Sequence, residues 1–598
     1  MAMSRTRKII LIVSGIVVAL LLVALIGLAL LVAAFRGGAP DIRDNSVLAM
    51  RVAGSLPDYV PDDPLRKLLG GSSNSLSDFV LQLRKAKVDK RLKAVLLEID
   101  MSGVGWAKAE EIRDAISDFR SSGKPVYAYL EYGMNKEYYI ATACDRIYLA
   151  PPGELFINGL AADVMFFRGS LDKLGVYPDI YQIGKYKTAG DMFTRKEMSD
   201  AHKEYVNALL DDLFQRYTET VAKARGKSAT DMLAIIDNAP YSAKNAKAAG
   251  LIDEVGYRDE LEKEIKTSLG YKDTDNLRLI SGSSYREVDP QSLGLNKGEK
   301  IAVIFASGDI GSGKSENSPS GEQSIGSDTL VKALNDARDN KTIKAIVLRV
   351  DSPGGSGLAS DIIWHAVAAA KEKKPVVVSM SDVAASGGYY ISASASKIIA
   401  QPSTITGSIG VVAGKPVIKG FYDWIGVTNE YVLRGKNAGM FRETEKFSDD
   451  ERKKFIEWIN TTYYDDFVPK VAQGRSKNVE YIDSVGQGRV WTGAQGKERG
   501  LVDEFGGLER AIEVAKQLAK IPADKGVQRV VLPYPRTLFQ QWFSGGSDDD
   551  ETTETRERAA ILANMPEDAR RAFRYMALFD RMKDGDPMLI MPFDLRIR

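Results

Sequence analysis

Two stretches of nearly the same sequence decide the fold: KAVLLEID at residues 93–100 and KAIVLRVD at residues 344–351. Each is a short apolar run, as expected for a strand that is buried on both faces. They lie about 250 residues apart, and matches at one fixed spacing indicate a repeated structural unit. Further pairs follow in the same order at nearly the same spacing: KPV (124–126 and 374–376), YYI (138–140 and 389–391), KLGV with WIGV (173–176 and 424–427), KTAG with KNAG (187–190 and 436–439), and GLIDEVG with GLVDEFG (250–256 and 500–506).

Each copy alternates predicted strands and helices. In the second copy, the strand at 344–350 is followed by a helical stretch at 358–373, a short strand at 375–380 and a small-residue helix at 386–396. This alternation is typical of an α/β fold. We therefore predict two tandem α/β domains that arose by internal duplication. The predicted boundaries are 1–37 for the N-terminal segment, 38–299 and 300–540 for the two halves, and 541–598 for an acidic linker and tail.

The N-terminal segment predicts a membrane anchor. Residues 9–35 are apolar and carry no charge, and a membrane-spanning helix needs about 20 such residues. Arg5, Arg7 and Lys8 precede this run, which favours a cytoplasmic start and folded domains on the other side of the membrane. The run is longer than the apolar region of a cleavable signal, so we expect a retained anchor; the alternative is a cleaved signal with a break near Ala33.

Composition excludes several classes of site. The net charge is +1, which gives no electrostatic basis for binding nucleic acid. Cys144 is the single cysteine, so no intrachain disulfide can form, and with only two histidines we expect no metal site. His365 is predicted to be a packed core residue and His202 an exposed helix residue.

GDIGSGKS at residues 308–315 has the spacing of a phosphate-binding loop. Such a loop must run into a helix whose N-terminus faces the phosphate. The residues that follow, SENSPSGEQS, are a poor helix start and include Pro319. We therefore interpret the motif as a surface loop and expect no nucleotide to bind.

Three small-residue stretches of the second copy are candidates for chemistry: DSPGGSG (351–357), ASGGYY (385–390) and TGSIG (406–410). A Pro-Gly-Gly turn exposes backbone amides that can stabilise an oxyanion. Ser386 would lie at a helix N-terminus, where the positive potential favours an alkoxide. Taken alone, these stretches also fit structural roles: a tight turn for the first, a helix N-cap for Ser386 and a turn residue for Ser408.

The first copy lacks these features. Asn135 stands opposite Ser386, DMSGV opposite DSPGG, and LFING opposite TGSIG. If the hydroxyl and the double glycine served folding alone, both copies would need them. Their presence in one copy indicates a function.

A serine nucleophile needs a base, and histidine is nearly absent. A lysine amine can serve once burial lowers its pKa towards neutrality. Lys187 (GKYKTAG) and Lys436 (RGKNAG) occupy matching places in the two copies and are both candidates. For either lysine the structural alternative is an ordinary solvated side chain.

Together, RVDSPGGSG, SDVAASGGYY, TGSIGVV and IGKYKTAG resemble the signal peptide peptidase A family of Ser-Lys serine proteases, in its long tandem-domain form. The resemblance covers the anchor and both halves, to about residue 520, and implies a ClpP/crotonase-like fold. It implies Ser386 as nucleophile, Lys187 of the first half as general base, an oxyanion hole at Gly354, Gly355 and Gly387, and Ser408 as the residue that orients the lysine. Lys436 is the alternative base, because its spacing from Ser386 resembles the single-domain members.

The resemblance further implies remnant signal peptides as substrates, no cofactor, and a homotetramer in the bacterial inner membrane with its catalytic domains on the periplasmic side. Two other functions fit parts of the pattern: a catalytically inactive membrane scaffold of the same fold, and a crotonase-like acyl-CoA enzyme. The apolar C-terminal stretch MLIMPFDLRIR (588–598) is assigned no role.

Overall fold

The computed structural model describes Gly15, Val23 and residues 41–60, 74–272, 274–315, 323–533, 587–591 and 596–597. The predicted anchor and the acidic linker therefore lie outside the described residues, apart from Gly15 and Val23. Within these ranges, no helix combines the length and the apolar character that crossing a bilayer requires.

The first half is built on a sheet with the strand order β7-β4-β3-β2-β1-β9. Its central strands pair in parallel, so they are buried on both faces and read as continuous apolar runs. The quoted stretch 93–100 lies in β2. The strands are β1 (Ser46–Gly54), β2 (Leu92–Ser102), β3 (Val126–Met134), β4 (Arg146–Phe156), β7 (Tyr241–Ser242), β9 (Leu279–Ser281) and β8 (Glu254–Val255), which pairs with β4.

The second half repeats this plan with the strand order β19-β17-β15-β13-β10-β21. Its strands are β10 (Glu299–Ser307), β13 (Ile343–Ser352), β15 (Val376–Ala385), β16 (Lys397–Ala400), β17 (Ile405–Gly407), β19 (Val490–Thr492), β20 (Glu504–Phe505) and β21 (Val527–Leu532). The quoted stretch 344–351 lies in β13, which takes the place that β2 has in the first half. The prediction of two tandem α/β domains is confirmed.

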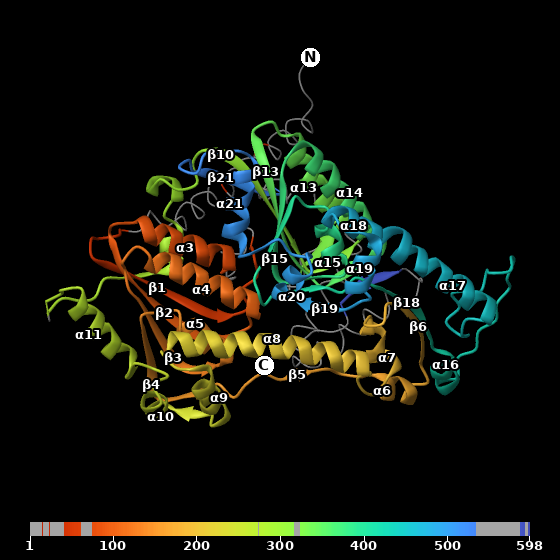
Figure 1. The fold of residues 1–598 in the computed structure, drawn as a ribbon, viewed down its shortest axis with the longest axis horizontal. Coiled ribbons are helices and arrows are strands. Elements are labelled where there is room, and N and C mark those ends of the chain that lie inside the picture. The colour runs from red at the N-terminus through yellow and green to blue at the C-terminus, as the bar shows by residue number, and fades with distance from the viewer. Residues whose placement is uncertain are drawn as a thin grey trace, which may run out of the picture.

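Helices at matching places cover both sheets, and each sheet packs its own apolar core (Figure 1). The matched helices of the two halves are α3 (Leu76–Val88) and α13 (Ser327–Asp339), α4 (Trp106–Arg120) and α14 (Gly357–Lys373), α5 (Asn135–Ala141) and α15 (Gly387–Ser392), α10 (Ala243–Ala248) and α20 (Gly493–Glu498), and α11 (Arg258–Ser268) and α21 (Leu508–Leu518).

Part of the first half crosses to the second. Helix α8 (Asp200–Ala224) runs along the base of both halves in Figure 1, and α6 (Arg168–Lys173) and α7 (Asp191–Thr194) lie beneath the second half. Strand β6 (Tyr177–Ile183) pairs antiparallel with β18 (Val411–Val417) of the second half. This crossing brings the residues after β6 to the second domain.

A third sheet joins these elements in the order β12-β11-β14-β22-β18-β6. It contains β14 (Gly354–Ser356), β22 (Met588–Ile590) from the C-terminal tail, β12 (Ser324–Gly326) and β11 (Asp309–Gly311). The phosphate-loop motif lies partly in β11, and the first described helix after it begins only at Ser327.

Buried ion pairs also link the halves. The guanidinium of Arg349, in β13, donates to Asp58 and Glu111 of the first half, each at 2.8 Å, and all three side chains are almost fully buried.

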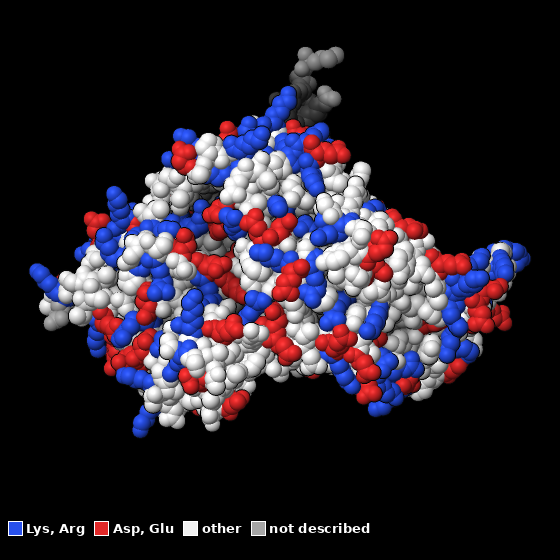
Figure 2. All heavy atoms as spheres, viewed as in Figure 1, with Lys and Arg blue, Asp and Glu red and all other residues white. Residues whose placement is uncertain are grey.

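The outer surface carries charges of both signs. In the view of Figure 2, acidic and basic side chains are interspersed and no large region carries one sign.

Candidate active site

Ser386 joins the end of β15 to the start of α15. It is completely buried and its φ is 54°, a left-handed conformation that is uncommon for a residue other than glycine. Its backbone N–H donates to the carbonyl of Gly407 at 2.8 Å, and its side chain makes no helix-capping hydrogen bond. Ser386 thus occupies the N-cap position of α15, as the structural alternative expected, but its hydroxyl does not cap the helix. Backbone strain of this kind clusters at functional sites.

Lys187 of the first half reaches this serine. Its Nζ lies 2.7 Å from Ser386 Oγ, and the lysine is completely buried. The loop that carries it is held by the second half, since the N–H of Tyr186 donates to the carbonyl of Gln487 at 2.7 Å. Burial lowers the pKa of Lys187 well below its ordinary value of 10.5. A buried amine of lowered pKa beside a hydroxyl has the arrangement of a base and its nucleophile.

Ser408 completes the contacts of the lysine. The Nζ of Lys187 lies 3.0 Å from Ser408 Oγ and 3.2 Å from the carbonyl oxygen of the same residue. Ser408 follows β17 and is completely buried, and its N–H donates to the carbonyl of Arg489 at 2.7 Å. The three polar contacts fix the direction of the amine towards Ser386.

The glycine turn lies against the amide that follows the serine. Gly354 has a φ of 113°, and a Cβ built on it would lie 2.9 Å from the nitrogen of Gly387. A Cβ built on Gly387 would lie 3.2 Å from the nitrogen of Gly355. Side chains at these positions would therefore collide with backbone amides, and glycine lets the amides gather at one place. Such a gathering of N–H groups can bind an oxyanion.

Lys108 and Asp351 support this turn, and sequence reasoning missed their role. Asp351 lies at the start of the turn and accepts from Lys108 Nζ of the first half at 2.8 Å and from the N–H of Val383 at 3.1 Å. Burial by itself lowers the pKa of Lys108, but Asp351, Asp58 and Asp382 together raise it above its ordinary value. The sequence did offer one signal for Asp351: it is a charged residue at the end of an apolar strand.

Lys436 lies apart from these residues. Its side chain is 74% exposed and pairs with Asp450 at 3.0 Å. Within one chain, the structure thus brings Lys187 to Ser386, whereas Lys436 stays on the surface.

Both predictions for the histidines are wrong. His202 is buried and stacks on Tyr205, with 5.3 Å between ring centroids, whereas His365 is exposed. The part of α8 near His202 packs on the second half through Tyr205, and the sequence around His202 does not show this contact between halves. Burial lowers the pKa of His202 to about 4.

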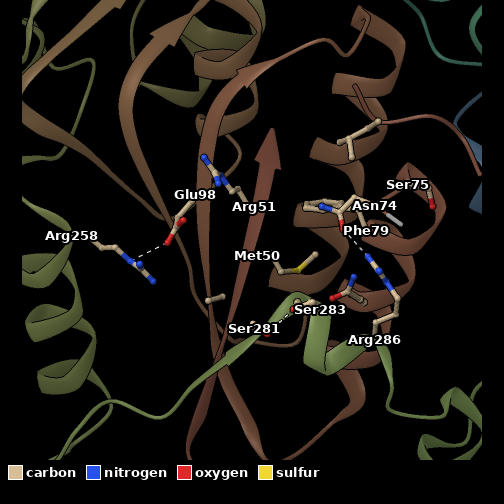
Figure 3. Close-up of a pocket in the computed structure, with 14 residues that line it drawn as sticks. Met50, Arg51, Asn74, Ser75, Phe79, Glu98, Arg258, Ser281, Ser283 and Arg286 are labelled. Carbon is tan, nitrogen blue, oxygen red and sulfur yellow. Dashed lines mark hydrogen bonds and ion pairs between the residues drawn. The ribbon is translucent and has the colours of Figure 1, made fainter. Parts of the chain in front are cut away.

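A cavity of about 320 Å³ lies elsewhere, between β1, α3 and β9 of the first half. Figure 3 shows Met50, Phe79 and Arg286 among its lining residues. None of the predicted site residues lines it, so it is separate from the Ser386 site.

Comparison with known proteins places the chain in a family. The profile of "Peptidase family S49" matches it twice, over residues 118–272 and 368–522. "Serine protease SPPA, chloroplastic" of Arabidopsis thaliana is 38% identical, over 84% of this chain and 74% of its own length. "Protease 4" of Salmonella typhi is 36% identical, over 76% and 75%. "Putative signal peptide peptidase SppA" of Enterococcus faecium is 34% identical, over 37% and 64%.

Proposed function

The chain belongs to peptidase family S49 and is a serine protease, and we propose that it cuts extended peptides through an acyl-enzyme formed on Ser386 with Lys187 as its base. The observation that carries this proposal is the 2.7 Å contact between two completely buried polar groups, one from each half. Burying an amine and a hydroxyl costs free energy, and groups whose pKa is shifted by such burial cluster at functional sites.

The mechanism follows from the contacts. Neutral Lys187 takes the proton of Ser386, whose oxygen attacks the peptide carbonyl carbon. The amides of Gly355 and Gly387 hold the oxyanion, whereas the N–H of Gly354 donates to Ser352 Oγ at 3.2 Å and so shapes the turn. The protonated lysine then gives its proton to the leaving nitrogen as the C–N bond breaks. Lys187 next deprotonates a water, which attacks the ester, releases the carboxylic acid product and restores Ser386.

Ser408 has the role of a positioning residue in this proposal. It touches the amine and not the substrate, and its two oxygens lie 3.0 and 3.2 Å from Nζ. Lys436 has no part in this reaction, because its side chain is exposed and paired with Asp450.

Remnant signal peptides are the proposed natural substrates. One relative carries the name signal peptide peptidase, and the predicted anchor would hold the site near the membrane where such peptides remain. We propose a single-pass protein of the bacterial inner membrane, with the catalytic domains on the periplasmic side and a fold of the ClpP/crotonase type. Mass measurement of the mature chain and its protection from external protease would test the anchor and its direction.

We also propose that chains assemble into a homotetramer. Segment 418–441 of the second half is the counterpart of the region by which the first half docks on β18. In a single chain it leaves apolar side chains uncovered: Trp424 is 74% exposed and Val432 is 85% exposed. Exposed apolar surface of this kind marks protein contacts. The first half of a neighbouring chain would cover it, and the mass of the detergent-solubilised complex tests this assembly.

Labelling with a fluorophosphonate probe tests the chemistry. We expect the probe to label the wild-type chain once, on Ser386, and to leave Ser386→Ala unlabelled. Ser392→Ala, a neighbouring buried serine, is the matched control and should label normally. A wild-type chain that neither labels nor cleaves peptides would contradict the proposal and favour a scaffold role.

A further inference from the structure

Two loops, one from each half, touch main chain to main chain beside the catalytic lysine. Residues 184–187 follow β6 and carry Lys187, and residues 486–489 lie between α19 (Val479–Val485) and β19. A Cβ built on Gly488 would lie 2.4 Å from the Cα of Lys187, and a Cβ built on Gly184 would lie 2.5 Å from the carbonyl carbon of Gln487. No side chain fits between the two loops, and a glycine on each side lets them meet.

Gln487 holds the lysine loop with both its backbone and its side chain. Its carbonyl accepts from the N–H of Tyr186 at 2.7 Å, and its Oε1 accepts from the N–H of Lys185 at 3.1 Å. On the side of the second half, its N–H donates to the hydroxyl of Tyr463 at 3.1 Å and its Nε2 donates to Asp483 at 2.5 Å. Each polar group of Gln487 is thus engaged, two with the lysine loop and two with the second half.

The backbone of this loop is strained. Gln487 has a φ of 50° and Gly488 a φ of 75°. Among the described residues, a left-handed φ occurs at only a few residues other than glycine, and Ser386, Ser408 and Gln487 are three of them. The two serines contact the amine of Lys187, and Gln487 contacts the loop that carries it. Strain of this kind persists where the surrounding contacts enforce it, and it clusters at functional sites.

The loop of residues 486–489 also holds the turn that orients the amine. The carbonyl of Arg489 accepts from the N–H of Ser408 at 2.7 Å, and the N–H of Gly488 donates to the carbonyl of Ile409 at 2.6 Å. The same loop therefore contacts the main chain of the base and the main chain of the TGSIG turn, and it fixes the position of one relative to the other.

The first half lacks this loop. Counted from the matched stretches GLIDEVG and GLVDEFG, Gly488 stands opposite Asn238. Helix α9 (Ala229–Asp237) continues up to the residue before Asn238, whereas its counterpart α19 already ends at Val485. Only the half that carries the nucleophile thus has the early helix end and the glycine, which indicates a role in the reaction and not in folding alone.

We propose that Gln487 and Gly488 are positioning residues for the base: they hold the main chain of the lysine loop at the place from which the amine of Lys187 reaches Ser386. This inference rests on the proposed function. Neither residue contacts the substrate in the proposed mechanism, so their replacement should lower kcat and leave KM little changed.

The first test is Gly488→Ala, assayed with a fluorogenic peptide that has an apolar residue before the cut. The new Cβ must displace the main chain of Lys187, and a displacement of about 1 Å costs about 100-fold in kcat. Gly123→Ala is the matched control, because Gly123 has a φ of 79° and open space around the built Cβ. It places the same substitution on a left-handed backbone without the contact and should keep kcat within about twofold.

The second test is Gln487→Ala, which keeps the main chain and removes the bond to the N–H of Lys185. We expect kcat to fall about tenfold. The acidic limb of the pH profile should also move to higher pH, because a looser loop admits water and the pKa of Lys187 then returns towards 10.5. Gln495→Ala is the matched control: it removes a bond to the carbonyl of Ala208 in the first half and leaves the lysine loop untouched.

The thermal midpoint of each variant separates a lost position from a lost fold. A folded Gly488→Ala chain with the kcat of the wild type overturns the inference, as does Gln487→Ala with an unchanged kcat and an unmoved acidic limb. Should Gly488→Ala not fold, Gln487→Ala decides alone, since Gln495→Ala must then keep both readouts. If the wild type neither cleaves the peptide nor labels at Ser386, it is the proposed function that fails.

Discussion

Replacing Lys187 with methionine removes the amine while keeping most of the side-chain volume. The lysine is completely buried and its Nζ contacts Ser386 Oγ at 2.7 Å and Ser408 Oγ at 3.0 Å. General base catalysis contributes a factor of about 100 to 10,000 in rate, or about 3 to 5.5 kcal/mol of transition-state stabilisation. We expect kcat/KM of Lys187→Met to fall by this factor, with KM little changed because the amine does not bind the substrate in our mechanism.

The substitution should not unfold the protein. Burial disfavours the charged form of Lys187, so an apolar side chain of similar volume at this place removes a desolvation cost. We expect the thermal midpoint of Lys187→Met to equal or exceed that of the wild type. This separates loss of chemistry from loss of fold.

The assay is cleavage of a fluorogenic peptide with an apolar residue before the cut. Lys436→Met is the matched control, because that side chain is 74% exposed and its pair with Asp450 is a surface pair of small energetic value. It should retain activity within about twofold. If Lys436→Met abolished cleavage and Lys187→Met spared it, the assignment of the base would be refuted.

Four further predictions concern the same site. The kcat/KM of the wild type should rise with pH through the lowered pKa of Lys187 and stay level above it, since only the neutral amine accepts the proton; a profile still rising at pH 10.5 would contradict burial as the cause. Ser408→Ala should cost about tenfold in kcat/KM and shift the acidic limb of that profile, whereas a merely structural role would leave the limb in place. Gly354→Ala should cost about 100- to 1,000-fold on the same peptide, because its Cβ would lie 2.9 Å from the nitrogen of Gly387 and displace that oxyanion donor. Lys108→Met leaves Asp351, whose side chain is 19% exposed, without its cation and should destabilise the fold by about 3 kcal/mol, the low end for a buried pair, seen as a lower thermal midpoint; an unchanged midpoint would show that the pair does not stabilise the turn.

The sequence predicted what is local and what is repeated. The strands at 93–100 and 344–351 follow from apolar runs, and the duplication follows from their spacing. The choice between Lys187 and Lys436 could not be made from residues alone, because it depends on the pairing of β6 with β18 across the two halves. That pairing leaves no local pattern, and both lysines sit in equivalent motifs.

The burial near His202 and the unassigned tail both depend on contacts between distant parts of the chain. Close to His202, α8 packs on residues of the second half through Tyr205, Val206 and Leu209, and the sequence around His202 does not show this contact. The strand Met588–Ile590 has no counterpart in either repeat, and its register depends on partners more than 170 residues earlier in the chain. Patterns of period two or 3.6 do not report such contacts.

The first half has a different side chain at the place equivalent to Ser386. Asn135 begins α5 at the place equivalent to Ser386, and its side-chain N–H donates to the carbonyl of Gly159 at 2.8 Å. Gly159 belongs to LFING, which is the counterpart of the TGSIG loop of the second half. In that loop, the carbonyl of Ser408 accepts from Lys187. In the first half, the side-chain amide of Asn135 thus bonds to a loop of the same half. In the second half, the corresponding loop is contacted by the amine of Lys187, which comes from the first half. In the proposed mechanism the two copies therefore divide the work: the first provides the buried Lys187 and has Asn135 at the place of the serine, and the second provides Ser386 while its Lys436 lies on the surface.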